Sequence, residues 1–127
     1  MLRTIQTDQA PKAIGPYSQA VAVGQFLYTS GQIPLDPQTQ TIAGTTIQEQ
    51  TKQVLANLDA VLAAAGTSWA QVVKTTVFMT DLTEFAEMNA IYEAHLGTAK
   101  PARSTVQVAA LPRNVKIEIE LVAFRQN

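Results

Sequence analysis

Three charged side chains late in the sequence have the types and spacing that small-molecule chemistry uses: Arg103, Glu118 and Glu120. Arg103 follows Pro101 and opens a predicted strand, so a planar guanidinium suited to bidentate binding of a carboxylate would stand at a fixed sheet end. Glu118 and Glu120 lie two residues apart in another predicted strand, so they share one face and their like charges should raise at least one pKa. A carboxylate tuned in this way could position or deprotonate a water molecule.

Each of these residues also has an ordinary structural interpretation. Arg103 could lie in solvent or form an ion pair with Glu118 or Glu120, and for an isolated arginine this interpretation is the better one. The two glutamates could mark the solvent side of an amphipathic strand, which is common. Residue types and spacing leave both interpretations open.

Two side chains beside turns are further candidates for lining a cleft. Tyr17 follows a Gly-Pro pair, and Ser30 precedes Gly31. At such positions side chains and backbone N–H groups can point into a pocket, although these residues more often serve packing or the turn itself. The single His95 lies near the end of a predicted helix, where it is favourably placed against the helix dipole, and we interpret it as structural.

The composition excludes several kinds of function. With no cysteine and one histidine, the chain has no thiolate nucleophile, no cysteine-ligated metal and no multi-histidine metal centre. Nine Lys and Arg residues are scattered among ten Asp and Glu residues, so there is no basic stripe to bind nucleic acid as a main partner. The longest apolar run, 60–65, is far shorter than a membrane span, and the polar start lacks a signal-peptide core. We therefore expect a cytoplasmic protein with no membrane partner.

A single domain covering residues 1–127 must position these side chains, because a second core would be too small at this length. Hydrophobic periodicity predicts the order β-β-α-β-α-β-β, with an optional further strand at the N-terminus. Thr46 with Glu49 forms a capping box for a helix that ends at Gly66. Asp81, with Glu84 three residues later, starts a second helix over about 83–96. The strands are expected at 19–23, 26–30, 73–79, 103–108 and 115–124.

Two helices can cover only one face of the resulting sheet, which predicts an α+β sandwich of one mixed sheet with both helices on one side. The other face would present Val122 and Phe124 beside the carboxylates of the last strand. The chain has no third layer to offer, so further copies of the chain are the economical cover. Charged groups near that interface would line a cleft between subunits.

Six sequence segments are recognisable together, in one order and over nearly the whole chain. They are IGPYSQA (14–20), YTSGQIP (28–34), VVKTTVFMTDL (72–82), MNAIYEAHL (88–96), PARSTVQVAALP (101–112) and VKIEIE (115–120). With these segments the chain resembles the reactive-intermediate deaminase (RidA/YjgF) family, and PARS followed by IEIE is a specific signature.

The resemblance implies a chorismate-mutase-like α+β fold and a homotrimer whose sheets form a central barrel, with active sites at the subunit interfaces. It implies hydrolysis of 2-imino acids, formed from enamines such as 2-aminoacrylate, to 2-oxo acids and ammonia. Neither a cofactor nor a metal ion is expected.

Carried over position by position, the resemblance implies that Arg103 holds the substrate carboxylate and that Glu118 positions the attacking water. Glu120 lies outside the matched position. The residues that would line the pocket are Tyr17, Ser30 and Gly31, with Asn89 and Tyr92 in its supporting wall.

Two positions depart from the family pattern. Thr105 stands where relatives often have cysteine, and activity should survive if this residue contributes mainly its backbone N–H to the carboxylate. Lys100 stands where some relatives have an aromatic residue, which leaves the preferred substrate side chain open.

Two other functions compete with the deaminase. The first is a non-catalytic trimeric module that binds small carboxylic acids and reports them to a partner protein; it would need Arg103 but not Glu118. The second is RNA cleavage, which has been attached to some relatives. The chain has neither a basic surface nor a histidine pair for that chemistry, so we place RNA cleavage last.

Overall fold

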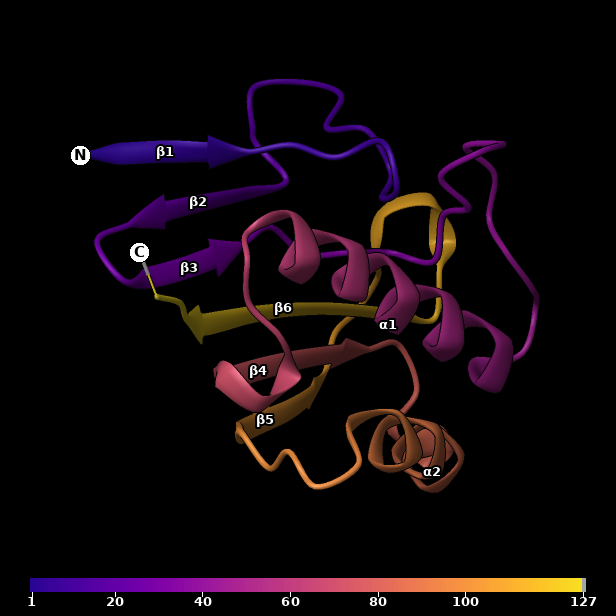
Figure 1. Cartoon of the computed structure of the whole chain (residues 1–127). Helices are drawn as coiled ribbons and strands as arrows, with labels where there is room; N and C mark the ends of the chain where they lie inside the picture. Colours follow the sequence, from indigo (N-terminus) through magenta and orange to yellow (C-terminus); the bar gives the residue numbers. More distant parts are fainter. Residues whose placement is uncertain (127) are drawn as a thin grey trace.

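One mixed sheet forms the centre of the fold in the computed structural model, which describes residues 1–126 (Figure 1). The strands are β1 (Leu2–Ile5), β2 (Ala20–Val23), β3 (Phe26–Thr29), β4 (Val72–Met79), β5 (Ala102–Gln107) and β6 (Ile117–Phe124). Their order in the sheet is β1-β2-β3-β6-β4-β5; β4 and β5 run parallel, and the other neighbouring pairs are antiparallel. The optional N-terminal strand is present as β1, and the hairpin turn between β2 and β3 contains Gly24 at a φ of 57°.

The two helices are α1 (Ile47–Ala64) and α2 (Phe85–Leu96). The predicted capping box of α1 is formed: the Glu49 N–H donates to Thr46 Oγ1 at 3.1 Å, and the Thr46 N–H donates to the Glu49 carboxylate at 3.2 Å. Just beyond α1, Gly66 has a φ of 77°, a conformation that glycine adopts without strain. The first predicted helix is therefore confirmed together with both of its end signals.

The second helix begins later than predicted. Asp81 Oδ1 accepts the backbone N–H of Thr83 at 2.9 Å and the Thr83 hydroxyl at 2.6 Å. This cap is followed by a short 3-10 turn, Leu82–Glu84, before α2 starts at Phe85. The prediction of α-helix from residue 83 was wrong at its start, because the tighter turn after the cap delays the α-helical hydrogen bonds.

The last strand is also shorter than the predicted range 115–124, since β6 begins at Ile117. Arg113 and Asn114 adopt positive φ angles of 58° and 57° in the turn before it. The N–H of Lys116 then donates to Gln50 Oε1 on α1 at 2.8 Å, so it is bound to the helix instead of to a neighbouring strand. The other predicted strand bounds differ from the structure by one residue.

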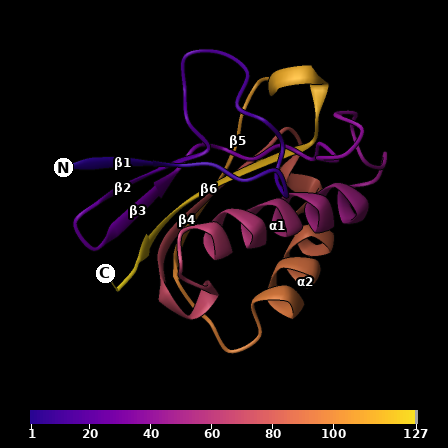
Figure 2. The ribbon, with the colours of Figure 1, turned by 45° about the horizontal axis from the view of Figure 1, so that its top comes forward.

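Both helices lie on one face of the sheet, which Figure 2 shows from the side, and the core fills the space between them. Leu27, Val77 and Ile119 point into this core from the three central strands and are fully buried. The predicted α+β class, with one mixed sheet and two helices, is therefore confirmed. Among residues 1–126, no helix combines the length and apolar character needed to cross a bilayer.

The opposite face of the sheet has no covering layer within residues 1–126. Side chains along β3, β6 and β4 alternate between the two faces of the sheet. Residues that pair with a buried residue across the strand register lie on the helix side, and the residues next to them in sequence lie on the open side. Large apolar side chains exposed on the open side are Val23, Phe26, Tyr28 and Val106. A face of this kind on a small protein indicates an interaction surface.

Candidate functional site

Arg103 is held rigidly on the helix side of the sheet. It lies beside Thr75 in the register of β5 and β4, and Thr75 is fully buried under α2. The Arg103 Nη1 atom donates to Asn89 Oδ1 at 2.6 Å. The guanidinium carbon lies 4.8 Å from the ring centroid of Tyr92 and 5.4 Å from that of Phe85. Three residues of α2 therefore hold the guanidinium.

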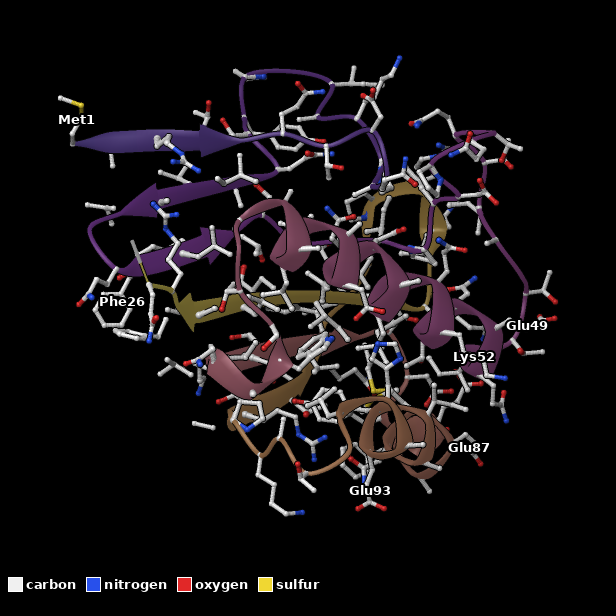
Figure 3. The ribbon with its side chains drawn as sticks, viewed as in Figure 1. Met1, Phe26, Glu49, Lys52, Glu87 and Glu93 are labelled. Carbon is white, nitrogen blue, oxygen red and sulfur yellow. The ribbon has the colours of Figure 1, made fainter. Side chains whose placement is uncertain are left out.

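The guanidinium faces a cleft of about 330 Å³ between the C-terminal half of α2 and the loop into β5, which we call the arginine cleft. Lys100 lines it and is exposed, and Glu93 projects outward from α2 (Figure 3). Among residues 1–126 Arg103 forms no ion pair, so the alternative pairing with Glu118 or Glu120 is not formed. The lining residues are Asn89, Tyr92, Glu93, Leu96, Gly97, Ala99, Lys100, Pro101 and Arg103.

Glu118 lies in a second group of predicted residues, with Ser30 and Gly31, which we call the glutamate cluster. Gln32 and Ile119 exchange backbone hydrogen bonds of 2.8 and 3.1 Å, which brings the start of the long loop alongside β6. A Cβ atom at Gly31 would overlap the Glu118 carboxylate, so only glycine allows this approach.

The loop beside the glutamate cluster is anchored by Ser30. Its hydroxyl donates to the carbonyl of Ser18 at 2.6 Å, and its N–H donates to the carbonyl of Gln19 at 3.0 Å. Tyr17 precedes this contact in the chain and its side chain is 53% exposed. Ser30 thus holds the start of the loop whose Gly31 lies against Glu118, whereas Tyr17 lies at the surface.

The pKa of Glu118 is raised above the ordinary range of a glutamate, first because the carboxyl is half-buried and second because Glu120 carries a like charge nearby. The sequence predicted this direction for at least one of the pair from their mutual repulsion. Burial is the larger cause, and alternation along the strand gave no sign of it. A raised pKa makes Glu118 a stronger base for taking a proton from water.

The arginine cleft and the glutamate cluster are far apart within one chain. Arg103 lies beside Thr75 on the helix side, whereas Glu118 lies beside Phe78 on the open side. Strand β4 separates β5 from β6, so the two backbones are two strand spacings, or roughly 10 Å, apart, and the side chains point to opposite faces. A three-carbon or four-carbon molecule cannot contact both within one copy.

The other residues singled out in the sequence lie outside the contacts described above. Thr105 shares the sheet side of Arg103, and its hydroxyl oxygen is buried with no hydrogen-bond partner among residues 1–126. Glu120 lies on the open side, beside Thr76. His95 Nε2 lies 2.8 Å from Asp59 Oδ1, which links α2 to α1 and agrees with a structural role.

Sequence reasoning missed Phe85, whose ring lies against the Arg103 guanidinium, and Thr75, whose hydroxyl lies beside that of Tyr92. Neither residue was among the predicted site residues. No local pattern links either one to residue 103. The signal was limited to alternation along the strand, which places Thr75 on the same face as Val77.

The fold and the two groups of residues define a class: a small α+β protein with an arginine held at a cleft on one sheet face and a half-buried glutamate of raised pKa on the other. The family model described as Endoribonuclease L-PSP matches residues 7–125. The chain belongs to this family, which includes the Rid proteins.

Individual relatives cover almost the whole chain. It is 50% identical over 129 residues to the 2-iminobutanoate/2-iminopropanoate deaminase of Salmonella typhimurium, covering 99% of this chain and 100% of that protein. It is 55% identical over 124 residues to a RutC family protein of Synechocystis, covering 96% and 95%. The crystal structure of Escherichia coli TdcF with bound serine superposes with a TM-score of 0.93 at 46% identity, covering 98% and 99%. The predicted family resemblance is confirmed.

Proposed function

We propose that this protein hydrolyses reactive 2-imino acids, formed from enamines such as 2-aminoacrylate, to 2-oxo acids and ammonia, without a cofactor or metal ion. The observation that best supports this function is the arrangement of Arg103: Asn89 and Tyr92 hold its guanidinium, and it still has donors free for a carboxylate at the cleft. The deaminase of Salmonella typhimurium, at 50% identity, supports the same reaction.

In the proposed reaction, Arg103 binds the carboxylate and so fixes the neighbouring imine carbon, whose nitrogen is protonated. Glu118 takes a proton from water as the water oxygen bonds to that carbon, which gives a carbinolamine. The Glu118 carboxyl then returns its proton to the amine nitrogen, the C–N bond breaks, and ammonia leaves. The carbon–oxygen double bond forms as the hydroxyl proton passes to solvent.

The reaction requires little of the protein beyond positioning the substrate and the water molecule. A protonated imine carbon is already electrophilic, so holding the carboxylate and delivering water from one side supplies most of the required acceleration. The raised pKa of Glu118 adds basicity at the proton-transfer step. Tyr17, Ser30, Gly31 and Thr105 are the further residues that we propose around the substrate.

We also propose that the site is completed between copies of the chain, in a homotrimer with a central barrel. Two observations support this arrangement. Arg103 and Glu118 point to opposite faces of one sheet, so a second copy must bring its own Glu118 to the first copy's Arg103. The open sheet face carries exposed apolar side chains that such an assembly would cover.

A carboxylate-binding module without catalysis is the second candidate function. The observation that favours it is that the arginine cleft is formed within one chain and does not include Glu118. RNA cleavage, which the family description names, is disfavoured by the net charge of −1 and by the lack of a basic stripe in the sequence.

A coupled assay separates the two candidates. A dehydratase generates 2-aminoacrylate or 2-iminobutanoate, and release of the 2-oxo acid is timed with and without this protein. We expect acceleration by the wild type, loss of acceleration in Glu118→Gln with retained binding of 2-oxobutanoate, and a milder effect in Glu120→Gln. Wild-type turnover by Glu118→Gln would contradict the water-activating role and favour the binding module.

A further inference from the structure

A buried pair of hydroxyl groups lies directly beneath the arginine cleft. Thr75 on β4 is fully buried, and its Oγ1 atom lies 2.8 Å from the hydroxyl of Tyr92 on α2. Thr75 has no role in the proposed reaction and does not line the cleft. Its hydroxyl therefore reaches the site through Tyr92.

Tyr92 connects this pair to the guanidinium. Tyr92 is 7% exposed, and the centroid of its ring lies 4.8 Å from the Arg103 guanidinium carbon, on which the ring stacks. A buried phenol hydroxyl needs a partner, and Thr75 supplies one that fixes the ring. Thr75 also pairs with Arg103 in the register of β4 and β5. The residue that contacts the Tyr92 hydroxyl therefore lies next to the residue on which the Tyr92 ring stacks.

The orientation of the Arg103 guanidinium matters because one of its nitrogen atoms already donates a hydrogen bond within the chain. Nη1 donates to Asn89 at 2.6 Å, which leaves Nη2 and Nε as the donors with no partner inside the chain among residues 1–126. Two N–H groups must lie in one plane with a carboxylate to bind it bidentately. A tilt of the ring beneath the guanidinium would move that plane.

We propose that Thr75 is a positioning residue of the carboxylate site, which fixes Tyr92 and thereby the plane of the Arg103 guanidinium. The proposal rests on the proposed function, because it assumes that Arg103 binds the ligand carboxylate. In the absence of Thr75 Oγ1, the Tyr92 hydroxyl lacks its buried partner and the ring shifts to find another. Ligand binding then weakens more than the chemical step, since Thr75 touches no reacting atom.

The test compares two buried threonines. Thr75→Val removes the hydroxyl at nearly constant volume. Thr51→Val is the matched control, because Thr51 is also fully buried and its hydroxyl also forms one hydrogen bond, to the Ile47 carbonyl at 2.7 Å within α1. For each variant, the Kd for 2-oxobutanoate is measured by calorimetry, kcat and KM by the coupled assay, and Tm by thermal unfolding.

We expect Thr75→Val to raise Kd and KM roughly three- to tenfold, with kcat changed less than about twofold, as the loss of one hydrogen bond in a positioning network predicts. Thr75→Ser should restore both. Thr51→Val should lower Tm by a similar amount and leave Kd unchanged. Tyr92→Phe removes the same hydrogen bond from the other side, and combining it with Thr75→Val should add no further loss of affinity.

Tyr92→Phe also serves as the test if Thr75→Val does not fold. The proposal is overturned if Thr75→Val, or Tyr92→Phe in its place, lowers Tm while Kd and KM stay at wild-type values, as a purely structural hydrogen bond would require. Failure of the proposed function looks different: the wild type itself would neither bind 2-oxobutanoate nor accelerate imine hydrolysis.

Discussion

The arginine cleft and the glutamate cluster differ in how completely one chain builds them. Asn89, Tyr92 and Phe85 hold Arg103 from a single helix, and a cleft lies in front of it. Glu118 instead lies half-buried on the open sheet face, against Gly31, with no cation within salt-bridge distance among residues 1–126. One region is completed by side chains of the same chain, whereas the other presents a half-buried carboxylate on the face that residues 1–126 leave uncovered. The comparison supports the proposal that one copy supplies Arg103 and a neighbouring copy supplies Glu118.

The largest effect is expected from breaking the arginine cleft. Arg103→Ala should abolish 2-oxo acid binding and deaminase activity while leaving the assembly intact and lowering Tm only modestly, because among residues 1–126 Arg103 makes no ion pair and its removal costs only its contacts with α2. Arg103→Lys keeps the charge but loses the planar fork, which should cost about 1 to 3 kcal/mol of ligand affinity. Calorimetry, light scattering and thermal unfolding check these outcomes. A dissociated or unfolded Arg103→Ala protein would return Arg103 to a structural role.

Breaking the glutamate cluster should reduce catalysis more than ligand binding. In Gly31→Ala the new methyl group must displace the Glu118 carboxylate, which should lower kcat by up to about a hundredfold. The matched control is Gly24→Ala. Its methyl group meets no atom within 4 Å, but the alanine backbone must adopt a positive φ in the hairpin turn. The control should therefore lower Tm without lowering kcat. Equal kcat in the two variants would separate Gly31 from the site.

A smaller effect concerns pH and sharpens the role of burial in the glutamate cluster. The rate should rise with pH as Glu118 loses its proton, and the raised pKa places this rise above the ordinary range of a glutamate. Glu120→Gln removes the like charge and so lowers the pKa of Glu118, which should shift the rise in kcat toward lower pH. Because burial is the larger cause, the shift should be only partial. A rise in rate that stays at the wild-type pH in Glu120→Gln would show that the two glutamates are not coupled.

The smallest effect is expected at the rim of the arginine cleft. Lys100 lines the cleft but is exposed, so its charge is screened by solvent. Lys100→Gln should change the Kd for pyruvate by less than about threefold, because Arg103 supplies the charge that binds the carboxylate. Lys12→Gln, on an exposed loop outside the cleft, is the control. A tenfold loss in Lys100→Gln alone would make Lys100 a second carboxylate-binding group.

The secondary-structure elements could be predicted from the sequence better than the contacts between residues of different elements. The capping box of α1, the hairpin at Gly24 and the alternation of β6 are local signals, and each is present in the structure. The contact of Gly31 with Glu118 joins distant segments, and it depends on the loop bridging to β6. The Thr75–Tyr92 pair likewise depends on how α2 packs over β4. Such contacts follow from register and packing, for which a single sequence has no local code.

The prediction that Arg103 and Glu118 share a site shows the same limit. Both residue types suit the chemistry, and family resemblance gave both a role. Whether they meet in one chain depends on which face each strand presents, and that follows from the pairing of β4 with β5 and with β6. Those pairings place the two side chains on opposite faces. The sequence could therefore suggest the two residues but could not show on which face of the sheet each one lies.

Mixing two inactive variants tests the central claim most directly. Arg103→Ala and Glu118→Gln chains are unfolded, combined in equal amounts and refolded, and imine hydrolysis is compared with that of each variant refolded alone. If one copy supplies Arg103 and its neighbour supplies Glu118, about a quarter of the interfaces in a randomly mixed assembly regain both wild-type residues. We predict recovery of activity toward that fraction, in particles with three times the 13.7 kDa chain mass. A properly assembled mixture no more active than its two components would contradict the shared site.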